Sequence, residues 1–359
     1  MAAAVLVIPA GNPDLAPAGP LAEGLRAADA GVEVRLSEPP GPSLAPGNPA
    51  AGVAMRIASR SAAKELPGLV TLNGAQVVVS DDPVVIAAMG RLRLSEALVV
   101  PAVALVTRPA DPASQAADGV DVHLIADLGF RAAVREAAPA TRIACVRGLV
   151  DPRYEGELEV DRARQAIGVP DGSPLVVIFG GQEARGDLGG AGEVALAADP
   201  ASRVVILCGE NEERRRELGE WFSRARRIRV VGPTDRLPEL LAAADVLIDT
   251  ADGLTALEAR LRGAAVVAHG AGAGRGRQEL ADALIDALRR PRDTGTGIAD
   301  RPAAADEVLA AAGLAPLRAT PRARRPRPPP APRATTAAPR SRASRAVRPS
   351  AVSISTSAA

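Results

Sequence analysis

Short apolar runs alternate with amphipathic segments along most of the first 290 residues. In the first half these runs are rich in Val, Ile and Leu, which is typical of buried strands. They span residues 5–8, 32–36, 77–80, 103–106, 122–125 and 143–146. The segments between them carry apolar residues at helical spacing, at 20–28, 84–91 and 128–137. This alternation predicts a parallel sheet covered by helices on both faces. Residues 37–52 are rich in Pro and Gly and predict an irregular loop.

The pattern breaks between Gly148 and Gly156 and then restarts. The second set of strands is predicted at 175–179, 204–207, 228–231, 246–248 and 265–268. Helices are predicted between them at 161–167, 212–223, 237–243, 254–262 and 278–288. The fold class is therefore α/β, with two doubly wound, Rossmann-like domains at 1–150 and 151–300. Ligands of such sheets bind outside the carboxyl ends of the strands, so we expect a site in a cleft between two facing domains.

The charge of the chain is distributed unevenly. No acidic residue follows Glu307, but ten arginines lie between Arg318 and Arg348. Residues 1–307 then hold 33 basic and 42 acidic residues, a net charge of about −9. The segment 301–359 is also rich in Pro, Ser, Thr and Ala, which predicts a disordered basic tail. We expect no nucleic-acid partner.

The cysteines and the hydropathy indicate the compartment. Cys145 and Cys208 lie in apolar strand-like runs, which favours buried thiols in a reducing environment. The N-terminus lacks a basic region and predicts a first strand rather than a signal peptide. The longest apolar run, 97–106, is about ten residues and contains Pro101, against about 20 residues needed to span a bilayer. These features predict a cytoplasmic protein, with peripheral contact to the inner face of the membrane left open.

The segment from Asp245 to Glu279 carries the clearest chemistry. A short strand runs into a polar turn that opens a helix near Gly253, and a second strand is followed by another loop and helix. Two helix N-termini at the carboxyl ends of strands favour phosphate binding, through free N–H groups and the helix dipole. Thr255 lies in the first turn of its helix, and Glu258 shares its face. A hydroxyl beside the phosphates and a carboxylate for a ribose diol predict a nucleoside diphosphate site.

Three further turns follow predicted strands. Gly180, Gly181 and Gln182 come directly after the strand at 175–179, where glycines let a backbone approach a phosphate; a tight turn would use the same glycines. Asn211 and Thr234 end the next two strands. Each could offer polar groups to a nucleobase or belong to a structural loop.

Other sites are excluded by what the chain lacks. The glycines from Gly270 to Gly274 are not followed by a strand with an acidic end, so a dinucleotide site is not expected. Lys64 is the only lysine, which excludes a P-loop. His123 and His269 have no neighbouring ligand set and are interpreted as core or strand-end histidines. We expect no metal and no cofactor.

Between about residues 76 and 285, several segments match one enzyme family. The most specific is Asp252-Gly-Leu-Thr-Ala-Leu-Glu258, beside the family's Gly-Gly-Leu-Thr-x-x-Glu. The other segments are 78–80, 121–126, 147–150, 180–181, 208–211 and 232–237. In these the chain resembles family 28 glycosyltransferases of the GT-B fold. The resemblance is greatest to the processive diacylglycerol glycosyltransferase (monogalactosyldiacylglycerol synthase) branch, and more distant to the lipid II GlcNAc transferase.

The resemblance implies transfer of a hexosyl group from a UDP-sugar to a lipid or other hydroxyl acceptor. Helix N-termini would stabilise the leaving diphosphate without a metal. The residues implied on the donor side are Leu254 and Thr255 with Gly253 at the diphosphate, Glu258 at the ribose, Gln278 and Glu279 at the sugar hydroxyls, and Thr234 near the base.

The N-terminal half departs from the family. Asp14 stands where the family has a His that activates or orients the acceptor, and an aspartate of ordinary pKa, near 4, is a weak base unless it is desolvated. The stretch from Thr107 to Gln115 lacks the Asp, His and Trp of a second family segment. Two alternatives therefore stay open: a non-catalytic nucleotide-sugar-binding module and a GT-B nucleotide-sugar epimerase.

Overall fold

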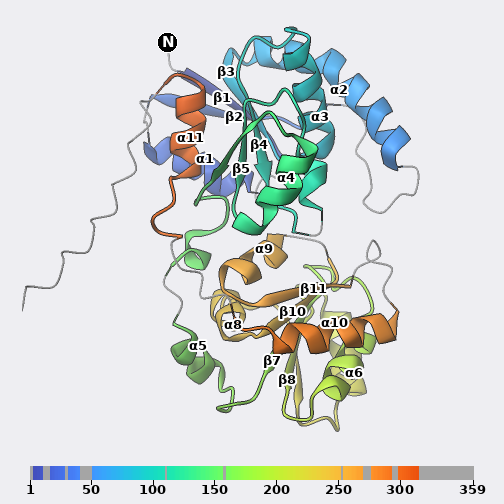
Figure 1. Ribbon diagram of the computed structural model, residues 1–359. Coiled ribbons are helices and arrows are strands. Elements are labelled where there is room, and N and C mark those ends of the chain that lie inside the picture. The colour runs from blue at the N-terminus through green and yellow to red at the C-terminus, as the bar shows by residue number, and fades with distance from the viewer. Residues whose placement is uncertain are drawn as a thin grey trace, which may run out of the picture. The chain divides into compact units, whose positions relative to one another are not determined.

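Two parallel sheets, each with its own helices, make up the computed structural model (Figure 1). The described residues are 3–10, 17–28, 31–40, 51–109, 111–156, 159–251, 254–269, 276–292 and 298–314. Asp14, Gly253, the 270–274 loop and the segment from 315 to 359 lie outside them.

The first sheet has the strand order β2-β1-β3-β4-β5-β6, and every pairing is parallel. Its strands are β1 Ala3–Ile8, β2 Val32–Leu36, β3 Ala75–Ser80, β4 Ala102–Val106, β5 Val122–Ile125 and β6 Arg142–Cys145. The six predicted strands are confirmed to within two residues at each end. Strand β4 is buried along its whole length, as expected for a continuous apolar run in a sheet with helices on both faces.

The first domain contains a helix that the sequence pattern did not predict. Helix α2, Ala51–Leu72, begins inside the predicted loop and contains Pro67. Pro and Gly disfavour a helix locally, but Ala58 and Ala62 pack against Val84 and Ala88, and this contact outweighs the propensity. The domain's other helices are α1 Ala18–Ala28, α3 Pro83–Leu94 and α4 Arg131–Ala137, with short 3₁₀ turns η1 Pro112–Gln115, η2 Leu128–Phe130 and η3 Pro152–Tyr154.

After α10 the chain returns to the first domain. Helix α11, Ala304–Ala311, packs on α1 and buries Ala304 and Val308. Glu307 of this helix is buried and ion-paired with Arg142 at 2.7 Å. The predicted start of the tail at residue 301 is therefore corrected: residues 298–314 are structured, because an Ala- and Leu-rich stretch can bury one helical face.

The second sheet has the order β11-β10-β7-β8-β9, again wholly parallel. Its strands are β7 Leu175–Phe179, β8 Arg203–Leu207, β9 Ile228–Val231, β10 Val246–Asp249 and β11 Ala265–Ala268. Its helices are α5 Val160–Ile167, α6 Leu188–Ala198, α7 Glu212–Trp221, α8 Leu237–Ala243, α9 Leu254–Leu261 and α10 Arg277–Arg289. The five strands confirm the prediction.

Helix α6 was not predicted, because three glycines occupy its first turns. The structure explains two of them. A Cβ at Gly189 would lie 2.7 Å from the Trp221 ring, and one at Gly192 would lie 2.9 Å from the Phe222 ring. Glycines that weaken the isolated helix therefore make room for the stacked pair Trp221 and Phe222, whose ring centroids are 5.8 Å apart.

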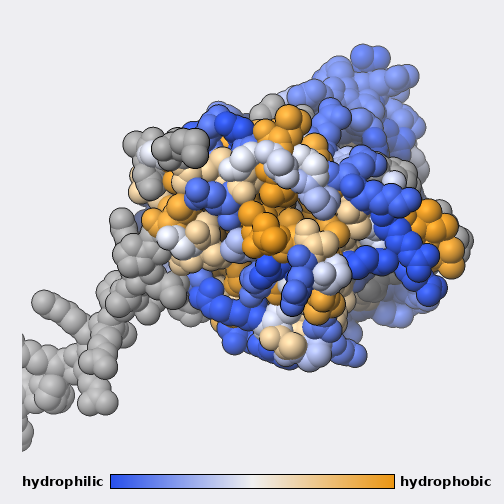
Figure 2. All heavy atoms as spheres, turned by 90° about the horizontal axis from the view of Figure 1, so that it is seen from above, coloured by the Kyte–Doolittle hydropathy of each residue, from blue (hydrophilic) through white to orange (hydrophobic). Residues whose placement is uncertain are grey.

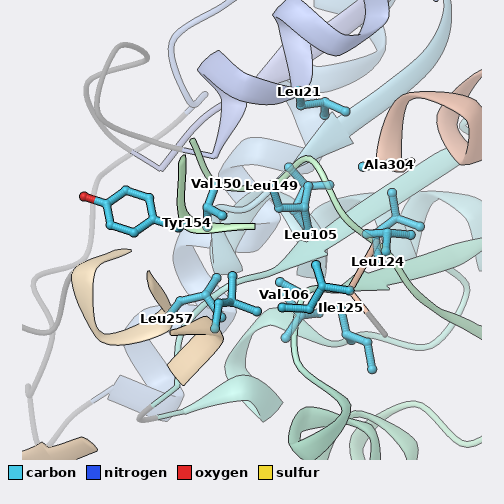
Figure 3. Close-up of a cluster of buried hydrophobic side chains, with 14 of the residues drawn as sticks. Leu21, Leu105, Val106, Leu124, Ile125, Leu149, Val150, Tyr154, Leu257 and Ala304 are labelled. Atoms are coloured by element: carbon cyan, nitrogen blue, oxygen red, sulfur yellow. The ribbon is translucent and has the colours of Figure 1, made fainter. Parts of the chain in front are cut away.

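Hydrophobic residues lie on the surface as well as in the core. Seen from above, hydrophobic residues flanked by hydrophilic ones lie at the right-hand edge, the side on which α2 is drawn in Figure 1 (Figure 2). One buried cluster runs from Leu105 and Leu124 of the first sheet through Leu149 to Leu257 of α9 (Figure 3).

Within the described residues, no helix is long and apolar enough to cross a membrane.

Both cysteines are free thiols in the structure. Cys208 is buried and Cys145 is half-buried. Burial raises the pKa of each thiol, so both are expected to be unreactive at neutral pH.

Candidate functional site

The order of the second sheet defines where a ligand is expected. From β7 the chain moves outward through β8 to β9, and then crosses to β10 and β11 on the other side. The direction of winding therefore changes between β7 and β10. The carboxyl ends of the two strands at such a switch point form the usual ligand crevice of an open α/β sheet. The two strongest sequence motifs, after β7 and after β10, lie on its two sides.

The turn after β7 is closed by its own backbone. Arg185 N donates to Gly180 O at 2.7 Å, and a Cβ at Gly180 would lie 2.7 Å from Arg185 O. Gly181 has φ +73°, a conformation that favours glycine. A tight turn thus accounts for both glycines. Gly181 is half-exposed and Gln182 exposed, so phosphate approach at these two residues stays a prediction.

The turn after β8 packs against the turn after β7. Glu210 N donates to Gln182 O at 2.8 Å. Both ends of the Asn211 amide make a hydrogen bond: its oxygen accepts from Arg214 N at 2.9 Å as the N-cap of α7, and its nitrogen donates to Glu183 O at 3.0 Å. These contacts favour the structural-loop interpretation of Asn211.

The turn after β10 leads directly to the predicted diphosphate residues. Thr250 Oγ1 donates to Arg185 O at 2.6 Å, which ties this turn to the one after β7. Helix α9 then begins at Leu254, with Thr255 buried in its first turn and Glu258 one turn on. The spacing predicted for these residues is therefore present on one helix at the switch point.

Glu258 is a buried carboxyl in the second domain. Its side chain is only 8% exposed. Burial raises its pKa to about 7, against the opposing effects of a hydrogen bond with Thr255 and the charge of Arg153. A buried carboxyl at a ligand crevice, half charged near neutral pH, is a common feature of functional sites.

Tyr154 is a neighbour of this carboxyl that was not identified from the sequence. It follows the linker between the domains in η3 and is 5% exposed. Burial and the charge of Glu258 raise the pKa of its hydroxyl. Figure 3 shows the hydroxyl directed away from the hydrophobic cluster. The sequence feature that could have identified Tyr154 is its rarity, because it is one of five aromatic residues in the chain and lies where the domains join.

Gln278 and Glu279 lie at the start of α10, after the edge strand β11. Both are exposed; Gln278 Nε2 donates to Asp282 Oδ1 at 3.0 Å, and Glu279 Oε2 accepts from Gly276 N at 3.2 Å. Glu279 and Asp282 line a hollow of about 420 Å³ beside β11. Carboxylates there would repel a diphosphate but accept hydrogen bonds from sugar hydroxyls.

Thr234 lies apart from these residues. It follows β9, the other edge strand, which is two strands from β7 and hence roughly 10 Å away. Its hydroxyl accepts from Arg236 N at 3.1 Å. A nucleobase near Thr234 stays a prediction.

His123 is confirmed as a core histidine. It is buried in β5, where Nδ1 lies 3.0 Å from Thr141 Oγ1 and Nε2 accepts from Ala117 N at 3.2 Å. Burial lowers its pKa to about 4, so it is neutral at pH 7. In the part of the chain that the structure describes, no group of three His, Cys, Asp or Glu could hold a metal ion.

Comparisons with known proteins identify the fold. No family model matches the chain, and no curated protein matches it. Among solved structures, UDP-GlcNAc 2-epimerase from Neisseria meningitidis, bound to UDP-GlcNAc, is 12% identical with a TM-score of 0.51, covering 87% of this chain and 99% of the epimerase chain. A variant of Os79 from O. sativa in complex with UDP is 15% identical with a TM-score of 0.52, covering 87% and 100%. The two parallel-sheet α/β domains of this chain therefore have the GT-B fold.

Proposed function

We propose that the protein binds a UDP-sugar at the β7–β10 switch point and transfers its hexosyl group to a hydroxyl acceptor. The observation that carries this proposal is the pairing of Thr255 with the buried Glu258 at the start of α9. Two solved structures that share the fold contain UDP or UDP-GlcNAc, which supports the same ligand here.

The proposed roles are those that the family resemblance implies, and the position of these residues supports them. The N-terminus of α9 faces developing negative charge on the leaving diphosphate, with the Thr255 hydroxyl as a further donor. Glu258 accepts hydrogen bonds from the ribose diol. The donor sugar extends toward Gln278 and Glu279, whose polar atoms suit its hydroxyls. No metal or cofactor enters this scheme.

Calorimetry with UDP tests the donor site. We expect micromolar binding to the wild-type protein and at least a tenfold loss in Glu258→Ala, about 1.4 kcal/mol. Glu239→Ala is the matched control, because Glu239 is exposed and ion-paired with Arg236 in the same domain. No binding of UDP to the wild-type protein would remove the proposal and leave only a shared fold.

Two alternatives are separated by their products. An epimerase, which the likeness to the Neisseria enzyme keeps under consideration, would interconvert sugar nucleotides without an acceptor and release no stoichiometric UDP. A binding module would bind UDP-sugar and change nothing. Incubation with a panel of sugar nucleotides, with and without acceptors, followed by chromatography of the nucleotides, distinguishes the three.

We further propose that the acceptor is a lipid presented at an anionic membrane surface. One exposed stripe of α2, at spacings of three and four residues, supports this; its members are Val53, Arg56, Ile57, Arg60 and Lys64. Val53 and Ile57 are 57% and 61% exposed. The stripe carries cations and β-branched side chains and no acidic residue, whereas residues 1–307 as a whole have a net charge of about −9. A cationic and apolar surface of this kind suits anionic headgroups.

Vesicle sedimentation tests this stripe. Since each cation near an anionic surface contributes about 1 kcal/mol, Arg56→Gln, Arg60→Gln and Lys64→Gln together should lower partitioning onto phosphatidylglycerol vesicles by roughly 100-fold. The control removes the same charge from α7, with Arg214→Gln, Arg215→Gln and Arg216→Gln, and should leave most of the binding. Equal losses in the two triple variants would show that general charge, not α2, is responsible.

A further inference from the structure

The first sheet has its own switch point, and a buried carboxylate lies at it. From β1 the chain winds outward to β2, and then crosses to β3 and onward through β6. The carboxyl ends of β1 and β3 therefore flank the crevice expected for a ligand of this domain. Asp81 is the first residue after β3, and its side chain is 5% exposed.

Hydrogen bonds fix Asp81 in place from both neighbouring strands. Its Oδ1 accepts from Ala10 N, just after β1, at 2.8 Å. Its backbone oxygen accepts from Gln115 Nε2 at 2.7 Å. Gln115 is fully buried, and its Oε1 accepts from Thr107 N and Arg108 N, just after β4, at 2.8 and 2.9 Å. Asp81 is thus held through one carboxylate oxygen and through its backbone oxygen, where three strands end.

The surroundings of Asp81 suit proton transfer near neutral pH. The charged groups that act on it are Arg108, half-buried beyond β4, and Asp82, next in the chain. Burial raises the pKa of Asp81 to about 6, against the opposing effects of the Ala10 hydrogen bond and of Arg108. Asp82 differs, because its Oδ1 accepts from Val84 N and Val85 N, at 2.8 and 3.0 Å, and caps α3.

We propose that Asp81 is the general base of the transfer, an inference that rests on the proposed function. The Asp81 carboxylate takes the proton of the acceptor hydroxyl while the acceptor oxygen forms its bond to the anomeric carbon. The bond from that carbon to the diphosphate oxygen breaks, and its electron pair leaves with UDP. Asp81 then returns its proton to solvent. The acceptor therefore binds at the carboxyl ends of β1 and β3.

A purely structural role would leave a different signature. An asparagine at 81 can still accept from Ala10 N, so Asp81→Asn preserves the tie between β1 and β3 but cannot take a proton. Asp82→Asn is the matched control, because asparagine caps a helix as well as aspartate does. The two variants remove the same charge from adjacent residues.

The experiment measures UDP release from a panel of UDP-sugars with lipid and soluble hydroxyl acceptors, alongside UDP calorimetry on the same proteins. We expect Asp81→Asn to bind UDP as the wild type does and to release UDP at least 100-fold more slowly, within the usual contribution of a general base. Asp82→Asn should stay within about threefold. The wild-type rate should fall as the pH drops through about 6, where Asp81 becomes protonated, and Asp81→Asn should lack that limb.

The outcomes separate this inference from the proposed function. UDP release by Asp81→Asn at the wild-type rate, or the same pH profile in both, would overturn the role of Asp81 and leave the transferase proposal intact. UDP binding without release by the wild type under any condition would overturn the base and retain the donor site. Absence of UDP binding would overturn both.

Discussion

Glu258→Gln is expected to stabilise the unliganded protein at pH 8 by about 3 kcal/mol. Burial raises the pKa of Glu258 from 4.5 to about 7 in the folded state, so between these pH values the folded protein holds a proton that the unfolded chain has already lost, and above pH 7 it carries a buried charge. Stability from this group is fully present below pH 4.5 and is lost as the pH rises through 7. Glutamine cannot ionise, so Glu258→Gln should not lose this stability as the pH rises.

The measurement is urea unfolding of wild type and variant at pH 5 and pH 8. The gain from Glu258→Gln should be large at pH 8 and small at pH 5. Glu307→Gln is the control: Glu307 is buried to a similar extent but ion-paired with Arg142, so its replacement should destabilise the protein. A loss of stability in Glu258→Gln at pH 8 would mean that its charge is compensated in the folded protein.

The same substitution should weaken UDP binding. A ribose diol donates to a carboxylate, so ligand binding favours the charged form of Glu258 and lowers its pKa. Affinity for UDP should therefore rise between pH 6 and pH 8 more steeply in the wild type than in Glu258→Gln, where only the terminal phosphate of UDP titrates in this range. A residue that destabilises the free protein while it strengthens ligand binding is selected for function rather than for folding.

The sheets were predictable from the sequence because their strands are uniform runs of apolar residues. Strand β7, Leu175–Phe179, needs no tertiary information to be recognised, and the strand boundaries agree closely throughout. Helices α2 and α6 were not predictable by the same means. Pro67 and Gly192 oppose a helix locally, and only packing against Val84 and Phe222, distant in sequence, makes these helices stable.

The arrangement of the candidate site was predictable where one local element carries its residues. Thr255 and Glu258 are three residues apart on one helix and share a face whether or not that face is buried. Their spacing alone was therefore enough to predict that they lie together. Asp81 was not identified, because its position after a strand is ordinary and its burial depends on Gln115 and Ala10. Gly180 shows how a local pattern can leave two interpretations open: the glycines suit phosphate approach or a tight turn, and the structure shows that the tight turn alone requires a glycine there.

Gly209→Ala is expected to cost about 3 kcal/mol of folding free energy. Gly209 has φ +52°, which costs an alanine about 1 kcal/mol, and its new Cβ would lie 2.4 Å from Gln182 Cα and 2.5 Å from Gln182 O. These are backbone atoms that cannot move aside as a flexible side chain would. The turns after β7 and β8 must then separate, at a further cost of about 2 kcal/mol.

Gly172→Ala measures the conformational cost alone, so its comparison with Gly209→Ala gives the cost of the clash. Gly172 has φ +72°, but a Cβ added there would meet no atom within 4 Å, so alanine should cost only about 1 kcal/mol. Urea unfolding of both variants measures the difference, and UDP calorimetry on the folded fraction measures its effect on the site. Because Gln182 is displaced only in Gly209→Ala, that variant alone should bind UDP more weakly. Equal unfolding costs in the two variants would show that the turns after β7 and β8 yield freely.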